Sequence, residues 1–280
     1  MTYYNDLEIN DINFDSSDDE DDIPFEELHS KPPLAKNSLA LTIDRPTIKL
    51  NSFIKFQRCS IIPYAHYKDD IIFFFNVYRG LDDDNFVEEL SDFGGTCQNV
   101  ETFMETACYE TFEESLGIFN FMFQDNEIAA SSTAICSLDR SIIILLLPVN
   151  LTDRPNKIIE SFIERRNKLS QYEPESIKYY LNRYFNRSLV AINTPEKVDK
   201  DWDKEHLFRE RISPINIDES SDILYINGKN LLKLLEGKNV KTPAAISITT
   251  EYKYYPQIYP VVASRLLQSK FLIDLILNTC

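Results

Sequence analysis

Short apolar runs separated by polar and turn-forming residues dominate the chain from about residue 46 onwards. The runs at 47–56 (TIKLNSFIKF), 59–65 (CSIIPYA) and 70–79 (DIIFFFNVYR) are rich in β-branched and aromatic residues, which favours β-strands. The run at 134–149 (AICSLDRSIIILLLPV) also predicts strand, and its continuous apolar residues are typical of a strand buried on both faces. We expect these strands to belong to one sheet.

Other stretches show helical periodicity. Apolar residues recur at helical spacing from Val100 to Leu116, which predicts an amphipathic helix between two loops that carry Gly94-Gly95 and Gly117. Further along, the pattern predicts two helices in 154–187 broken near Glu173-Pro174, a strand, turn and helix in 222–235 with the turn at Asn227-Gly228, and a closing core helix in 259–277.

Composition and charge divide the chain into a tail and a folded part. The 280 residues are 43% hydrophobic, which is enough for the core of one large domain or two small ones. Residues 1–30 contain eleven Asp and Glu and no Lys or Arg, so the remainder carries a formal charge of only −5 out of −16. We expect residues 1–40 to be an acidic disordered tail and 46–280 to be the folded domain. The overall charge therefore does not exclude nucleic acid as a partner.

Cysteine and histidine usage excludes some chemistries and indicates a compartment. The five cysteines show no CxxC spacing and the three histidines are scattered, which makes zinc and thiol chemistry unexpected and predicts reduced thiols. The start of the chain has no signal-peptide pattern, and the longest apolar run, 142–149, is too short for a bilayer span. These features predict a soluble cytoplasmic protein without a membrane partner.

An acidic cluster is the main candidate for chemistry. Residues 92–119 contain six carboxylates, and no Lys or Arg occurs between Arg79 and Arg140. The cluster is either a solvated surface or the binding site of a cation. Three of its members, Glu110, Glu113 and Glu114, share one helix face, where like charges cost a few tenths of a kcal/mol per pair, roughly. Hard oxygen ligands of this kind suit Mg²⁺ or Mn²⁺ bound together with phosphates.

The same stretch resembles the Nudix box, GX5EX7REUXEEXGU, where U is an aliphatic residue. The spacing matches at Gly95, Glu101, Glu110, Glu113 and Glu114, and Gly117-Ile118 follows. The sequence departs from the motif in three respects: Tyr109 stands in place of Arg, Thr111 in place of an aliphatic residue, and one extra residue precedes Gly117.

The resemblance implies a fold and roles for individual residues. The fold would be an α/β/α sandwich of the α+β type, with a mixed sheet, a helical insertion at 154–187 and a C-terminal helix. The metal ions, Mg²⁺ or Mn²⁺, would be held by Glu110, Glu113 and Glu114 with the carbonyl of Gly95, while Gly94, Glu101 and Gly117 would be structural. The general base would be a glutamate of the box, Glu110 or Glu114, or one in a later loop. In that loop the candidate is Glu219, which could also be an additional ligand, with Glu205 and Glu210 as competitors.

The insertion directs the choice of substrate. It contains eight Lys and Arg against four Glu, interleaved with tyrosines. This composition is typical of a surface that binds nucleic acid. A helical hairpin that packs its tyrosines on the core would have the same composition. The chain is similar to the mRNA-decapping Nudix enzymes of large DNA viruses, which implies release of methylated GDP and 5′-monophosphate RNA in the host cytoplasm. The RNA-binding candidates are Arg165, Arg166, Lys168, Lys178, Arg183 and Arg187.

Two alternatives remain open. The protein could hydrolyse small substrates such as diphosphoinositol polyphosphates or nucleoside diphosphate derivatives, using the same basic residues. It could also be a noncatalytic binding module on a Nudix-like scaffold, which would account for Tyr109. The sequence indicates neither the oligomeric state nor the cap-binding residues.

Overall fold

A computed structural model describes residues 40–43, 55–82, 85–98, 101–137, 139, 141–194, 215, 217, 220–238 and 257–278. All of them belong to one unit, Ala35–Cys280. The acidic segment 1–39 and most of the predicted strand at 47–56 lie outside the described residues. The same holds for Glu205, Glu210 and Glu219.

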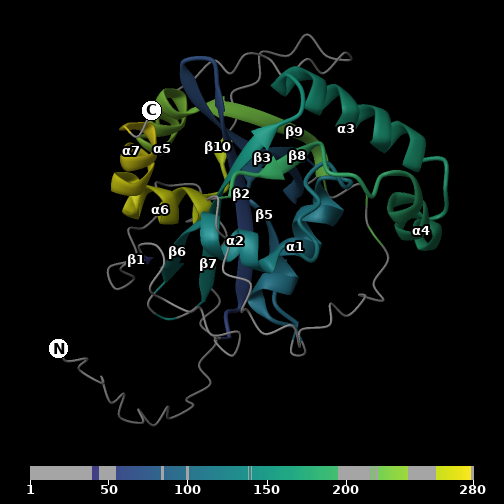
Figure 1. The fold of residues 1–280 in the computed structure, drawn as a ribbon, viewed down its shortest axis with the longest axis horizontal. Coiled ribbons are helices and arrows are strands. Elements are labelled where there is room, and N and C mark those ends of the chain that lie inside the picture. The colour runs from purple at the N-terminus through teal and green to yellow at the C-terminus, as the bar shows by residue number, and fades with distance from the viewer. Residues whose placement is uncertain are drawn as a thin grey trace. The chain divides into compact units, whose positions relative to one another are not determined.

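A mixed β-sheet forms the centre of this unit (Figure 1). Its strands run in the order β1-β6-β7-β2-β3-β4-β10, with β5 paired to β2, β8 to β7 and β9 to β3. The pairs β2–β7 and β4–β10 are parallel and the other pairs are antiparallel. The strands are β1 (Ala40–Ile43), β2 (Arg58–Tyr67), β3 (Asp70–Asp82), β4 (Asn85–Ser91), β5 (Phe93–Thr96), β6 (Thr133–Ser137), β7 (Ile142–Leu151), β8 (Val190–Ile192), β9 (Ser220–Asn227) and β10 (Gln257–Ile258).

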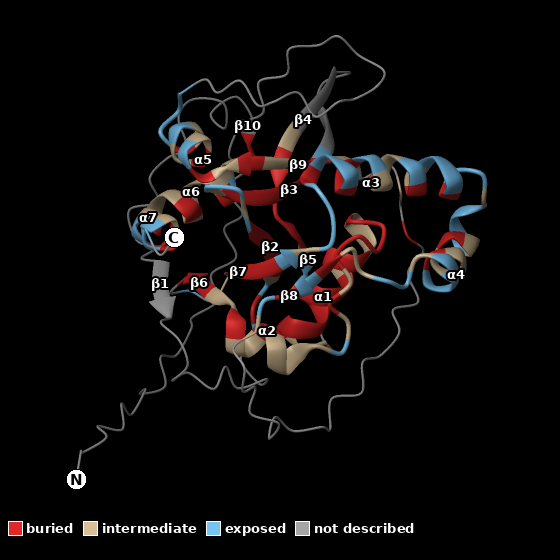
Figure 2. Ribbon diagram, turned by 45° about the horizontal axis from the view of Figure 1, so that its top comes forward, coloured by how far each residue is buried: buried red, intermediate tan, exposed pale blue. Residues whose placement is uncertain are grey.

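Helices cover both faces of the sheet, and each face has its own apolar core. Alternate residues of a strand point to opposite faces, so Phe74 belongs to one core and its neighbours Phe73 and Phe75 to the other. Figure 2 shows the strands of the sheet as mostly buried between these helices. One core includes residues of α1 (Phe103–Glu114), α2 (Asp125–Ser131), α3 (Pro155–Leu169) and α4 (Pro174–Tyr184), and the other of α5 (Gly228–Leu235), α6 (Pro260–Gln268) and α7 (Lys270–Asn278).

These elements confirm the predicted α/β class with a mixed sheet and a helical pair at 154–187. The predicted helix between Val100 and Leu116 is α1, and β7 is buried on both faces as expected, with residues 143–149 all buried. Asn227 is the N-cap of α5, because its side chain accepts a hydrogen bond from the Asn230 amide, 2.9 Å away.

Two predicted elements were wrong in their extent. The run 134–149 is two antiparallel strands, β6 and β7, because the Asp139 carboxylate accepts hydrogen bonds from the Ser141 amide and hydroxyl and so stabilises a turn between them. The closing helix is two helices, α6 and α7, with a break at Ser269. None of the helices among the described residues is long and apolar enough to cross a membrane.

Candidate functional site

The first turn of α1 uses one of the clustered carboxylates for capping. The Thr102 hydroxyl accepts a hydrogen bond from the Glu105 amide, and the Glu105 carboxylate accepts one from the Thr102 amide at 2.8 Å. This reciprocal arrangement is a capping box, and it satisfies two amides that the helix leaves without intrahelical partners. Glu105 therefore has a structural role at the start of the helix.

Glu101, the first glutamate of the motif, has a partner other than the motif arginine. The Thr106 hydroxyl donates a hydrogen bond to the Glu101 carboxylate at 2.9 Å. Tyr109, which replaces that arginine, is buried and its ring lies 5.9 Å from the Lys178 ammonium. The substitution thus exchanges a charged group for core packing, and a local hydroxyl contributes to holding Glu101.

The last turn of α1 accommodates the other two departures from the motif. Leu116 adopts a positive φ of 49°, and the Leu116 and Gly117 amides donate to the carbonyls of Glu113 and Phe112, which is a Schellman motif. The extra residue before Gly117 is the left-handed residue of this cap. Thr111 is buried, and its hydroxyl donates to the Ala107 carbonyl at 2.6 Å.

Gly94 and Gly95 lie in a strand, so the prediction of a glycine loop was wrong. They belong to β5, where Gly94 pairs with Ser60 and Gly95 with Cys59 of β2. A Cβ on Gly94 would lie 2.2 Å from the Ser60 Cβ, and a Cβ on Gly95 would lie 2.3 Å from the Glu110 Oε1. Close approach of neighbouring groups, not a turn, requires both glycines.

The glutamates near the end of α1 converge on this glycine strand. Glu110 places its carboxylate where a side chain at residue 95 would be, and Glu114 accepts a hydrogen bond from the Gly94 amide at 2.9 Å. Burial raises the pKa of the Glu114 carboxyl well above its ordinary value, and the carboxylates of Glu110 and Asp92 raise it further. The charge of Arg58 and the Gly94 hydrogen bond act in the opposite direction.

Asp92 and Arg58 belong to this site, although the sequence did not predict a role for either of them. The buried Asp92 carboxylate accepts hydrogen bonds from Arg58 Nη2 at 2.6 Å and from the Ser60 and Ser91 hydroxyls at 2.5 and 3.1 Å. The sequence contained a signal for Asp92, because this carboxylate lies only three residues before Gly95, the first residue of the motif. Arg58 had none, because its nearness to Asp92 depends on the pairing of β2 with β5.

Glu113 faces α4. Its Oε1 lies 3.8 Å from the Lys178 ammonium, and both side chains are mostly covered, with 15% and 14% of their surfaces exposed. The three glutamates of one helix face are therefore divided between two neighbours, β5 and α4. Within the described ranges, no three His, Cys, Asp or Glu side chains form a group that could hold a metal ion.

The glycine strand nevertheless fits the predicted metals as an incomplete ligand set. The Gly95 backbone is open to the Glu110 carboxylate because no side chain fills the space between them, and Glu114 adds a second carboxylate beside the same strand. Mg²⁺ commonly takes one or two carboxylates and completes its coordination with water and substrate phosphates. Glu110 and Glu114 supply those carboxylates, and the Gly95 carbonyl is the third ligand that the motif resemblance implies.

The six basic candidates of the insertion are in four different situations. Arg165 does not fit the predicted contact with RNA, because it is 7% exposed and its guanidinium donates to the Leu116 carbonyl at 2.8 Å. Lys178 is bound to α1, as described above. Arg166 is partly exposed, and the other three lie at the surface: Lys168, Arg183 and Arg187.

A group of tyrosines and cations covers the outer part of the helical pair. We call Lys168, Tyr179, Tyr180, Arg183 and Tyr184 the tyrosine surface. Tyr180 and Tyr184 are stacked with an interplanar angle of 7°, and 57% of Tyr179 and 49% of Tyr184 are exposed. The Arg183 guanidinium and the Lys168 ammonium lie 5.5 and 5.3 Å from the Tyr184 ring centroid. Tyr179 and Tyr184 are therefore largely exposed, whereas Tyr172 and Tyr180 are partly buried and pack against the core.

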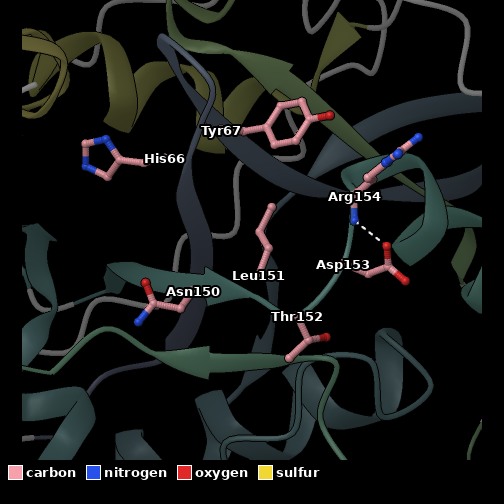
Figure 3. Close-up of a pocket in the computed structure, with 7 residues that line it drawn as sticks. All are labelled: His66, Tyr67, Asn150, Leu151, Thr152, Asp153 and Arg154. Carbon is pink, nitrogen blue, oxygen red and sulfur yellow. Dashed lines mark hydrogen bonds between the residues drawn. The ribbon is translucent and has the colours of Figure 1, made fainter.

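An open pocket of about 480 Å³ lies at the carboxyl ends of β2 and β7 (Figure 3). Its lining comes from His66 and Tyr67 and from residues 150–154. The Asp153 carboxylate is held at its rim by the Arg154 amide, 2.7 Å away. None of the residues that match the motif lines this pocket, so the pocket is a feature distinct from the glutamate site.

No protein-family model, curated protein or solved structure matches the chain. The likeness to the Nudix box therefore depends on the residues of the chain that match the motif.

Proposed function

We propose that this protein is a metal-dependent Nudix hydrolase that cleaves a pyrophosphate linkage, with the 5′ cap of mRNA as its substrate. The observation that carries the proposal is the convergence of Glu110 and Glu114 on the Gly94-Gly95 strand, at the motif's spacing. The products would be methylated GDP and 5′-monophosphate RNA.

Electrostatics argues against a purely structural role for these glutamates. The carboxyl end of a helix carries a partial negative charge, so acidic side chains there are unfavourable by a few tenths of a kcal/mol each, roughly. The last turn of α1 contains no basic residue, and Glu114 lies near two other carboxylates. A cation bound between α1 and β5 would compensate this excess of negative charge.

The chain's own residues divide the work as follows. Glu110 and Glu114, with the Gly95 carbonyl, would hold Mg²⁺ or Mn²⁺, and the bound ion would supply positive charge to the phosphates and lower the pKa of an attacking water. The ion pair of Arg58 with Asp92 links β2 to the residue before β5 and so stabilises this strand pair. Glu219, which lies just before β9 and outside the described residues, stays the candidate base.

The helical pair supports RNA as the substrate. Lys178 of α4 contacts Glu113 of α1, and the next residue along α4 is Tyr179 of the tyrosine surface. Exposed aromatic rings with nearby cations suit a single-stranded nucleic acid, because the rings stack on bases and the cations attract phosphates. The same helix therefore contributes both to the contact with Glu113 and to the tyrosine surface.

One observation favours a second candidate, a noncatalytic binding module. The Lys178 ammonium lies 3.8 Å from the Glu113 Oε1, so a positive charge of the protein itself already faces this carboxylate. Tyr109 in place of the motif arginine agrees with this function. A module of this kind would bind polyphosphate or RNA without turnover.

Cap-labelled RNA distinguishes these functions. The full chain is incubated with the RNA and Mg²⁺ or Mn²⁺ and the released label is resolved, with the double variant E113Q/E114Q as the inactive form. E105Q is the matched control, because it makes the same change on the same helix while glutamine preserves a capping box. We expect methylated GDP from the wild type and E105Q, and at least a hundredfold less from the double variant, as roughly expected for loss of transition-state electrostatics.

Other outcomes redirect the assignment. Hydrolysis of small diphosphates without cap release would move the substrate to that class. If the wild type turns over no substrate and RNA binding persists in E113Q/E114Q, the binding module would be favoured. Full activity of the double variant would show that the metal-site assignment is wrong.

A further inference from the structure

Two cysteines lie in contact next to the glycine strand. The Sγ atoms of Cys59 in β2 and Cys97, directly after β5, are 2.8 Å apart. A disulfide has an S–S length of about 2.05 Å, so the two sulfurs need to approach by less than about 1 Å to bond. No pattern in the sequence indicates that they pair, because 38 positions separate them.

Strand register explains why they meet. Cys59 pairs with Gly95, and the Cys97 amide continues the ladder by donating to the Gln57 carbonyl at 2.7 Å. Residues two apart on a strand share a face, so Cys97 lies diagonally opposite Cys59 on the face where Gly95 has no side chain. Cys59 lies in the core shared with α1 and Cys97 packs against that core, while the Glu110 carboxylate takes the place of a side chain at Gly95.

We propose that Cys59 and Cys97 are a modification site, at which a peroxide such as hydrogen peroxide forms a reversible intrachain disulfide between β2 and the end of β5. This inference does not depend on the proposed hydrolase activity.

The reaction balances with one peroxide. Cys97 is the more accessible sulfur, and Cys59 is buried. The Cys97 sulfur attacks one peroxide oxygen and the O–O bond breaks. The other oxygen takes up the thiol proton and leaves as water, and Cys97 becomes a sulfenic acid. The Cys59 sulfur then attacks Cys97 Sγ and the S–S bond forms as the S–O bond breaks. The sulfenic hydroxyl takes up the Cys59 thiol proton and leaves as a second water. Each sulfur loses one electron and the peroxide gains two, while a dithiol reverses the reaction.

The position of the bond gives it a local consequence. Gly95 lies two residues before Cys97 and opposite Cys59, and its neighbour Gly94 donates to Glu114. A covalent link at this point fixes β5 to β2 where the strand meets the glutamates. The disulfide closes a loop and so restricts the unfolded chain. The oxidised form should therefore melt at a temperature higher by about 5 °C, if the disulfide stabilises the protein to the usual extent.

Two other described cysteines are competitors. Cys108 on α1 and Cys136 on β6 are buried. Burial raises the pKa of the Cys59 thiol, and Cys136 is near enough to raise it further. The Cys59 and Cys97 sulfurs already touch at 2.8 Å, which favours a bond between these two.

The test uses the folded full chain. The protein is treated with a small excess of hydrogen peroxide, remaining thiols are alkylated, and the digest is mapped by mass spectrometry before and after dithiothreitol. We expect a Cys59–Cys97 cross-linked peptide with a mass lower by about two hydrogens, lost on reduction. The bond should persist in C136S, the matched control, and disappear in C97S together with the rise in melting temperature.

Three results would overturn the inference: a cross-link through Cys108 or Cys136 in place of Cys97, alkylation of both sulfurs after peroxide treatment, or oxidation of Cys97 to sulfinic acid without a cross-link. The mapping of the wild type decides the matter even if C97S does not fold.

Discussion

The two ends of α1 carry carboxylates in opposite surroundings. At its start, Glu101 accepts a hydrogen bond from Thr106 and Glu105 completes a capping box with Thr102. At its end, Glu110 lies against Gly95, and Glu114 has its pKa raised by burial and by neighbouring carboxylates. Negative charge is favourable at the first turn of a helix and unfavourable at the last.

This difference separates structure from function among residues of one type. The helix dipole and local hydrogen bonds account for the first pair without any ligand. For the second pair, the same principles predict a cost to stability, which evolution retains when a site needs the charge. The carboxylates near the end of the helix are therefore the candidate site, and the first two belong to its scaffold.

Substitution of the two glycines tests the end of the helix most severely. We expect Gly94→Ala to destabilise the fold by about 3 kcal/mol, because the new Cβ meets the Cys59 backbone and the Ser60 Cβ. Gly95→Ala meets only the flexible Glu110 carboxylate among its nearest atoms, so we expect a much smaller loss of stability and a large loss of activity. Urea unfolding and the cap-release assay measure the two effects, and equal stabilities of the two variants would contradict the assignment.

Removal of the arginine that holds the end of the helix should have the next largest effect. Arg165→Met leaves the Leu116 carbonyl without its buried donor, which should cost about 2 to 3 kcal/mol in the free energy of unfolding. Arg187→Met at an exposed position is the control and should change stability by less than about 0.5 kcal/mol. Similar stabilities for both variants would show that Arg165 has no structural role.

At the start of the helix, a smaller effect on stability alone is expected. Thr102→Ala removes the side-chain cap and should lower the free energy of unfolding by about 1 kcal/mol. Activity per folded molecule should not change, since the cap lies at the opposite end of α1 from the candidate site. A hundredfold loss of activity in a folded Thr102→Ala variant would break the distinction between the two ends.

The pH dependence of stability gives the finest test. The pKa of Glu114 is higher in the folded protein than the unfolded value of about 4.3, so its ionisation opposes folding. The contribution of Glu114 to the free energy of unfolding is most favourable below the unfolded pKa. It becomes less favourable as the pH rises, because the folded state binds more protons than the unfolded state. Without metal, Glu114→Gln should therefore gain stability relative to the wild type as the pH rises above the unfolded value of about 4.3. A difference independent of pH in urea unfolding would mean that Glu114 is not perturbed.

The local pattern of apolar residues predicted most of the helices and strands, but not the turns and breaks between them. The spacing of apolar residues found α1 and the two helices at 154–187, because each follows one helical period. The turn at Asp139 and the break at Ser269 were missed, since apolar residues continue on both sides of each and hide the interruption. The glycines were assigned to a loop because a Gly-Gly pair has the same local preference in a turn as in a strand that another group must approach closely.

Sequence spacing alone determined that Glu110, Glu113 and Glu114 share one helix face, because helical geometry is local. The tertiary structure decided their separate surroundings: Glu110 and Glu114 meet the glycine strand, and Glu113 meets Lys178 from a distant helix. It also decided that Arg165 is buried and that Cys59 touches Cys97. These contacts depend on strand register and helix packing between residues far apart in the chain, which no local pattern encodes.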